Sequence, residues 1–181
     1  MPELARIEPA AATSEVAELY ARMKKTIGAI PNMAQCMANS PAVLKAWLDL
    51  SGALNQGTLP VAVRERLALG TAEYNRCSYC LSAHTFLAKN VAKLDQAEID
   101  RARDAASNTP HVDAILKLSD AIARGHGSVA KEDIEDARKA GVTDQEIAEV
   151  IGNLALNVLT NYFNVFTDTP NEYPELVTPR H

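Results

Sequence analysis

Two cysteines and a histidine lie close together in the middle of the chain, at Cys77, Cys80 and His84. Two thiols at this spacing can form a disulfide, bind a metal or carry out redox chemistry, and an imidazole exchanges protons near neutral pH. The spacing i, i+3, i+7 lets one face of a helix carry all three side chains. We therefore expect the functional centre here.

The sequence also predicts where the cysteines lie in their helix. The pattern pauses at Asn75 and Arg76, and a new helix is expected to begin near Cys77. Free N–H groups and the positive end of the helix dipole lower the pKa of a thiol there. A thiolate attacks peroxides and disulfides, and a second thiol can resolve the resulting sulfenic acid. His84, one turn beyond Cys80, can take up the thiol proton and return it.

A histidine in this role needs a carboxylate that orients it. Glu65 lies on the preceding predicted helix, and an antiparallel helical hairpin would bring it across to His84. Glu73, four residues before Cys77, is a second candidate. Tyr79, between the cysteines, is expected either to line the pocket or to pack.

Metal and cofactor sites are not expected. A structural zinc site needs four ligands, usually two such pairs. The remaining cysteine and histidines, Cys36, His111, His126 and His181, are scattered and form no second pair. We expect Cys36 to be a small buried apolar residue.

Composition excludes several classes of protein. The 181 residues are 47% hydrophobic and 23% charged, with a net charge of −5 and no basic run, which argues against nucleic acid as a partner. No apolar stretch reaches the roughly 20 residues of a membrane span. The stretch from Met1 to Arg6 lacks the features of a secretory signal, so we expect a cytoplasmic protein without a membrane partner.

Helical periodicity predicts a single all-α domain, a helical bundle with the CxxC at a helix N-terminus. We expect an N-terminal helical extension at 1–39, the helical domain at 40–167 and an extended C-terminal tail at 168–181. Asp95/Glu98 and Thr143/Glu146 have capping-box spacing, and Pro31-Asn32 is expected to be a turn. Helices are expected at 14–27, from 40 towards 57, from 58 through 72, from 77, from 95, at 110–124, at 131–140 and from 143 through 163.

One known family carries the same pattern. Glu65, Glu73-Tyr74-Asn75, the CxxC and His84-Thr85 together resemble the core of the alkylhydroperoxidase D-like, or carboxymuconolactone decarboxylase, superfamily. The segments 28–32, 40–41 and 161–164 are similar to its longer, peroxidase-related branch. The resemblance implies an all-helical fold that assembles into trimers or hexamers.

The resemblance also implies a role for each residue. Cys80 takes the peroxide, and Cys77 acts as proton donor and resolving thiol. Glu65 and His84 form the proton relay. The best-known peroxidases of the family have a histidine where this chain has Tyr79, and a phenol with a pKa near 10 does not relay protons as an imidazole does.

The sequence therefore predicts a thiol-dependent peroxidase or disulfide oxidoreductase that takes a small-molecule hydroperoxide and a dithiol reductant. One alternative is a decarboxylase or isomerase acting on a lactone-like molecule, with acid–base work on His84 and Glu65. The other is a non-catalytic oligomeric module whose CxxC binds zinc or senses oxidation.

Overall fold

A computed structural model describes residues 4–180 of the chain, and this range is helical with no β-strand. The prediction of an all-α protein is confirmed. Residues 1–3, which are part of the stretch considered for a secretory signal, lie outside the described residues. His181, one of the scattered histidines considered as a metal ligand, also lies outside them. The elements are the 3₁₀ turn η1 (Pro9–Ala11) and the helices α1 (Ser14–Ile27), α2 (Asn32–Met37), α3 (Pro41–Leu54), α4 (Val61–Tyr74), α5 (Ser78–Asn90), α6 (Gln96–Arg103), α7 (Pro110–Arg124), α8 (Lys131–Lys139) and α9 (Asp144–Thr167).

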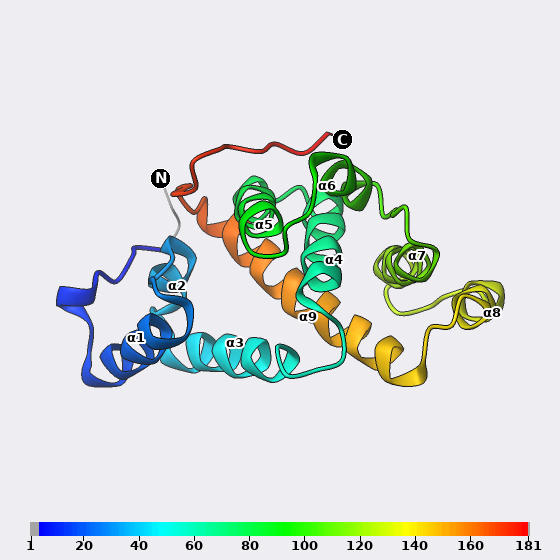
Figure 1. Cartoon of the computed structure of the whole chain (residues 1–181). Helices are drawn as coiled ribbons and strands as arrows, with labels where there is room; N and C mark the ends of the chain where they lie inside the picture. The colour runs from blue at the N-terminus through cyan, green and yellow to red at the C-terminus, as the bar shows by residue number, and fades with distance from the viewer. Residues whose placement is uncertain (1–3, 181) are drawn as a thin grey trace.

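The helices are arranged around α4, α5 and α9. Helices α4 and α5 form a hairpin, and the long α9 crosses behind it, with α1 to α3 on one side and α7 and α8 on the other (Figure 1). Helix α9 packs against α2, α3, α4, α5 and α7. This central position agrees with its apolar residues on more than one face.

Local sequence signals account for most helix ends. Ser40 and Thr143 accept a hydrogen bond from the backbone at the third helical position, and Glu146 completes the capping box with Thr143. Gly28 ends α1 in the left-handed conformation, with φ of 83°. The predicted turn at Pro31-Asn32 was wrong, because α2 begins at Asn32. Its six residues are too few to show a helical period.

Buried side chains form two clusters. One lies among α1, α2, α3 and α5, and the other lies among α4, α7 and α9. Helix α4 contributes to both, since Leu69 and Ala72 belong to the first cluster and Val63 and Leu67 to the second. Because its faces are buried against different partners, α4 is held firmly and can present single residues to defined neighbours.

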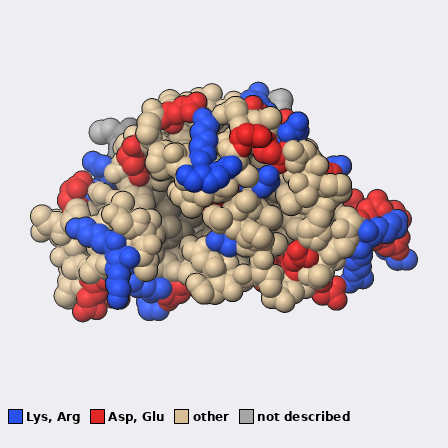
Figure 2. Space-filling view, viewed as in Figure 1, with Lys and Arg blue, Asp and Glu red and all other residues tan. Residues whose placement is uncertain are grey.

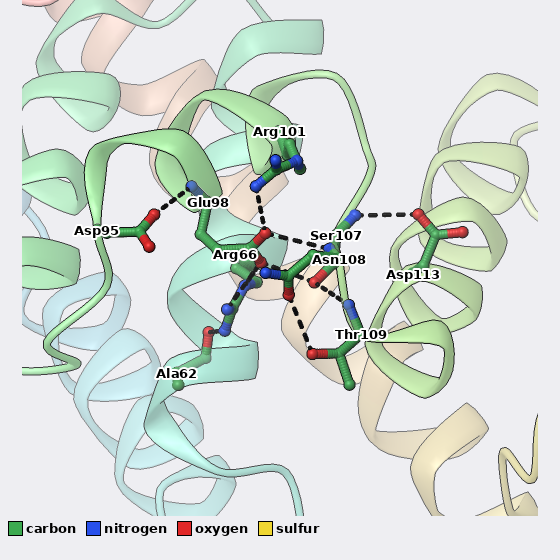
Figure 3. A network of polar contacts seen from close by, with 9 residues as sticks. All are labelled: Ala62, Arg66, Asp95, Glu98, Arg101, Ser107, Asn108, Thr109 and Asp113. Atoms are coloured by element: carbon green, nitrogen blue, oxygen red, sulfur yellow. Dashed lines mark hydrogen bonds and ion pairs between the residues drawn. The ribbon is translucent and has the colours of Figure 1, made fainter.

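A polar network fixes α4 against α6 (Figure 3). Arg66 donates from Nε and Nη2 to Oε2 of Glu98, at 3.2 and 2.9 Å. Glu98 also accepts from Arg101 and from the loop at Ser107 and Asn108. The Glu98 side chain therefore does not return to its own helix start, and only the Asp95 half of that predicted capping box forms.

The tail after α9 is extended, as predicted, and crosses α5 to end beside α6 (Figure 1). The backbone N–H of Val177 donates to Ser82 Oγ at 2.9 Å, and Arg180 pairs with Asp100 and Asp104 of the α6 region. The tail thus lies against the helix that carries the cysteines. The proposed boundaries at 39 and 167 stay a prediction. Within residues 4–180, no helix is both long and apolar enough to cross a membrane.

Candidate active site

The cysteine pair lies at the start of α5, where the local sequence puts it. Arg76 has a φ of 57°, and this turn ends α4 and reverses the chain. Cys77 is the N-cap of α5, and its Sγ accepts from the backbone N–H of Cys80 at 3.2 Å. Cys80 therefore lies in the first turn, next to the free N–H groups of the helix.

The two thiols are buried and in contact with each other. Cys77 and Cys80 are 1% and 3% exposed, and Cys77 Sγ donates to Cys80 Sγ across 2.6 Å. Nδ2 of Asn164, on α9, donates to Cys80 Sγ at 3.3 Å. Cys80 therefore receives two hydrogen bonds at its sulfur, and both favour a thiolate.

The electrostatics separate the two thiols. Burial by itself raises the pKa of Cys80, but the hydrogen bond from Cys77, the charge of His84, the hydrogen bond from Asn164 and the nearby amide of Asn161 outweigh it and lower the pKa to about 7. The pKa of Cys77 is raised, because its proton is held on the hydrogen bond to Cys80 and because it is buried. Cys80 is the more acidic thiol of the pair.

The α4–α5 hairpin brings Glu65 to His84, as expected. Glu65 Oε2 lies 2.8 Å from His84 Nδ1. A carboxylate only accepts, so Nδ1 carries the proton and Nε2 is the nitrogen free to exchange one. Burial lowers the pKa of His84, but the charge and hydrogen bond of Glu65 and the charge of Cys80 outweigh burial and raise it. A lowered thiol pKa beside a raised imidazole pKa favours a thiolate–imidazolium pair.

A cavity of about 270 Å³ opens beside these groups and is lined by Cys80, His84 and Glu65. It lies between α1 and α3 on one side and α4, α5 and α9 on the other, where the surface is hollowed (Figure 2). Its volume is close to the lower end of the range for small-molecule sites. Its apolar wall is built by Ile27, Met33, Trp47, Leu54, Leu87 and Leu156.

The other two candidate residues have different surroundings. Glu73 does not line the cavity. It accepts from Arg103 Nε at 2.6 Å and from the backbone of Arg180, so it holds the tail rather than His84. Tyr79 does line the cavity, and its hydroxyl donates to Glu172 Oε1 at 2.7 Å. Burial, followed by the neighbouring Tyr173 and Glu172, raises the pKa of Tyr79.

The structure adds site residues that the sequence reasoning left out. Asn164 donates to Cys80 Sγ, and Asn161, whose Oδ1 accepts from Asn75 Nδ2 at 3.0 Å, also contributes to lowering the pKa of Cys80. Tyr173, in the tail, lines the cavity, and its ring meets that of Tyr79 edge-on at 5.7 Å. One sequence signal existed for the asparagines. Four buried asparagines recur at helical spacing along α9: Asn153, Asn157, Asn161 and Asn164.

No group of three or more metal-ligating side chains occurs among residues 4–180. Cys36, His111 and His126 do not join the cysteine pair, and His181 lies outside the described residues. Cys36 is fully buried, as expected for a small apolar residue. His111 instead bridges Ala140 O and Glu146. Within the described residues the CxxC therefore has too few partners for a four-ligand zinc site.

Comparison with known proteins points to one family. Residues 41–124 match the sequence model of the carboxymuconolactone decarboxylase family. The matched stretch is just under half of the 181 residues, and over this stretch the chain is similar to that family. The matched segment contains Glu65, Cys77, Cys80 and His84. An alkyl hydroperoxide reductase of Mycobacterium tuberculosis is 29% identical over 92 residues, which are 50% of this chain and 27% of that protein. The chain thus spans about a quarter of that relative.

Solved structures share the fold over nearly the whole chain. An uncharacterized peroxidase-related protein of Ralstonia eutropha JMP134, with an alkylhydroperoxidase core, has a TM-score of 0.83 at 22% identity, covering 94% of this chain and 92% of that one. A cysteine-to-alanine variant of the debrominase Bmp8, in complex with 2,3,4-tribromopyrrole, has a TM-score of 0.78 at 16% identity, covering 95% and 92%. These likenesses show that the chain shares their fold.

Proposed function

We propose that this protein is a thiol-dependent peroxidase or disulfide oxidoreductase that reduces small hydroperoxides with the Cys77/Cys80 pair. The observation that carries the proposal is the environment of the Cys80 thiol. Its thiol lies in the first turn of α5, receives hydrogen bonds from Cys77 and Asn164, and lines a cavity with the Glu65–His84 pair.

In the first step, the Cys80 thiolate attacks the terminal oxygen of a hydroperoxide ROOH. The S–O bond forms and the O–O bond breaks, so Cys80 becomes a sulfenic acid and RO⁻ leaves. RO⁻ takes the proton of His84, which that residue received from Cys80. Glu65 orients the imidazole and favours its charged form, which is the direction of the pKa shift of His84.

In the second step, the sulfur of Cys77 attacks the sulfur of the sulfenic acid. A disulfide forms and water leaves. Cys77 Sγ is hydrogen-bonded to Cys80 Sγ, so the resolving thiol lies next to the sulfur that it attacks. An external dithiol then reduces the disulfide by thiol–disulfide exchange and is itself oxidised. Tyr79 donates to Glu172 and takes no part in this proton path.

The proposal is tested by peroxide consumption with a dithiol reductant. We expect Cys80→Ser to abolish turnover. Cys77→Ser should still react with one equivalent of peroxide per protein, but its turnover should be slower, because the external dithiol must then reduce the sulfenic acid directly. Unchanged turnover in both variants would refute the mechanism.

A second candidate function rests on a separate observation, namely that His84 and Glu65 pair with each other in the cavity wall through a contact that involves neither thiol. Such a site suits acid–base chemistry on a lactone-like molecule, as the name of the matched family suggests. Activity that survives removal of both thiols in a Cys77→Ser/Cys80→Ser double variant would favour this candidate. A sensing module would instead consume one equivalent of oxidant without turnover in the wild type.

We also propose that the protein forms a homo-oligomer, a trimer or a hexamer. Helix α9 exposes large apolar side chains along its length, and exposed apolar patches of this kind mark interaction sites. A monomer mass by light scattering would refute this. The exposed residues are Ile151, Leu159, Tyr162, Val165 and Phe166.

A further inference from the structure

Arg64 lies in the cavity, towards the end away from the cysteines. It is on α4 and lines the same cavity as Cys80 and His84. Its Nη1 donates to the carbonyl of Leu59 at 2.5 Å, and the N–H of Leu59 donates to Glu149 near the start of α9. The thiols lie near the other end of α4, since the Cys77 N–H bonds to Ala72 O. Ala72 and Arg64 are about 12 Å apart along the axis of α4, at about 1.5 Å per residue.

The partners of Arg64 differ from those of the other shielded arginines. Arg66 and Arg103 each have a carboxylate partner, Glu98 at 2.9 Å and Glu73 at 2.6 Å. Arg64 is half-buried, and the structure gives it no ion pair among residues 4–180. A guanidinium has five N–H donors, and the bond to Leu59 uses one of them. Shielding a charge from water without a partner is unfavourable, so this arrangement suits a ligand that brings the anion.

The other groups at the cavity leave room for such an anion. Among the residues that line the cavity, Arg64 is the single arginine or lysine and Glu65 is the single carboxylate, while the charge of His84 faces Glu65 and Cys80. Glu65 is bound to His84, so its charge is directed at the imidazole. Glu149 does not line the cavity. Its carboxylate accepts hydrogen bonds from the backbone N–H groups of Thr58 and Leu59 and from the Thr58 hydroxyl.

We propose that Arg64 binds the carboxylate of an amphipathic organic acid. The apolar body of this molecule fills the cavity along the wall formed by Trp47, Leu54 and Leu87, and its far end reaches Cys80. Binding of a carboxylate by Arg64 does not depend on which reaction takes place at Cys80 and His84. That the reactive group at the far end is a hydroperoxide rests on the proposed function.

Binding can be measured without any turnover. Trp47 is the single tryptophan of the chain and lines the cavity, so its fluorescence reports a ligand that enters. We would titrate octanoate and the uncharged octan-1-ol against wild type, Arg64→Met and Arg64→Lys. Arg76→Met is the matched control, because Arg76 is exposed and outside the cavity.

The expected result is a loss of about 10- to 100-fold in octanoate affinity for Arg64→Met, the range of one charge-assisted hydrogen bond. Octan-1-ol affinity should stay within about twofold, and Arg64→Lys should recover part of the loss. Equal affinity of wild type for the two ligands would overturn the proposal. An equal loss for both ligands in Arg64→Met would also overturn it, because it would mean that Arg64 only supports the Leu59 loop.

Turnover then connects the site to the reaction. Cumene hydroperoxide and its para-carboxylate derivative differ only in the negatively charged carboxylate on the ring, at the end opposite the hydroperoxide. We expect Arg64→Met to raise KM for the carboxylate selectively. If neither hydroperoxide is consumed while octanoate binding still depends on Arg64, the proposed function fails and the carboxylate site stands.

Discussion

Replacing Asn164 by leucine should raise the pKa of Cys80 without unfolding the protein. Nδ2 of Asn164 donates to Cys80 Sγ at 3.3 Å, and its buried Oδ1 has no hydrogen-bond partner. Leucine has a similar volume and removes both atoms. The variant therefore loses the donor to the thiolate and also loses a buried acceptor that is unsatisfied, so the cost to stability is small.

The size of the shift follows from the hydrogen bond. A hydrogen bond to a charged group contributes roughly 1.5–3 kcal/mol, and 1.36 kcal/mol corresponds to about one pKa unit. From a pKa of about 7, we expect a rise of about one to two units for the Cys80 thiol. At pH 7 the thiolate fraction would fall from about a half to between roughly a tenth and a hundredth.

The assay is the pH dependence of alkylation by iodoacetamide, followed by trypsin digestion and mass spectrometry. Cleavage after Arg76 and Lys89 leaves both cysteines in one peptide, and fragment ions distinguish Cys80 from Cys77. Asn157→Leu is the matched control, since Asn157 is buried on the same helix, lines the cavity and donates to Asn153 O. An unchanged midpoint in Asn164→Leu, or an equal rise in Asn157→Leu, would refute the reasoning.

Three further outcomes are expected. Glu65→Gln should lower the pKa of His84 in an NMR titration, because the charge of Glu65 raises that pKa, and an unchanged titration would contradict the pairing of the two residues. His84→Gln should slow peroxide turnover by about 10²-fold or more, because it removes the acid–base group. Tyr79→Phe should keep turnover within about threefold but increase hydrogen exchange in the tail, because it removes the bond to Glu172; a large loss of turnover would place Tyr79 in the proton path. Hydrogen bonds from Ser107, Asn108, Arg66 and Arg101 outweigh burial and lower the pKa of Glu98 to about 2. The contribution of Glu98 to stability is therefore complete above pH ~4.5 and is lost as the pH falls towards ~2. In denaturant unfolding, the stability of Glu98→Gln should decline less over that pH window than the stability of wild type.

Much of the fold could be predicted from local patterns. Caps and helix-ending glycines are read from adjacent residues, so the ends near Ser40, Thr143 and Gly28 were predicted correctly. The short α2 was missed because six residues give no period. The Glu98 side chain was assigned to a capping box because its spacing fits, but a buried arginine from α4 binds it more favourably than its own backbone does.

The candidate site also has a part that the sequence predicts and a part that only the structure decides. Helical spacing on α5 and a hairpin with α4 were enough to predict the Cys77, Cys80, His84 and Glu65 group, because these residues lie within 20 positions of one another. The sequence offered two carboxylates for His84, with Glu65 expected in the proton relay and Glu73 as a second candidate. Only the direction in which each leaves α4 separates them, with Glu65 facing His84 and Glu73 facing Arg103.

By itself, the sequence determined the helical class, the thiol pair at a helix start and the histidine one turn further on, since all of these follow from neighbours along the chain. Only the tertiary structure decided what surrounds the thiols. Asn164 reaches Cys80 from 84 positions away, and Glu172 reaches Tyr79 from 93 positions away. Such contacts depend on how α9 and the tail pack across α5, and no local period records that packing.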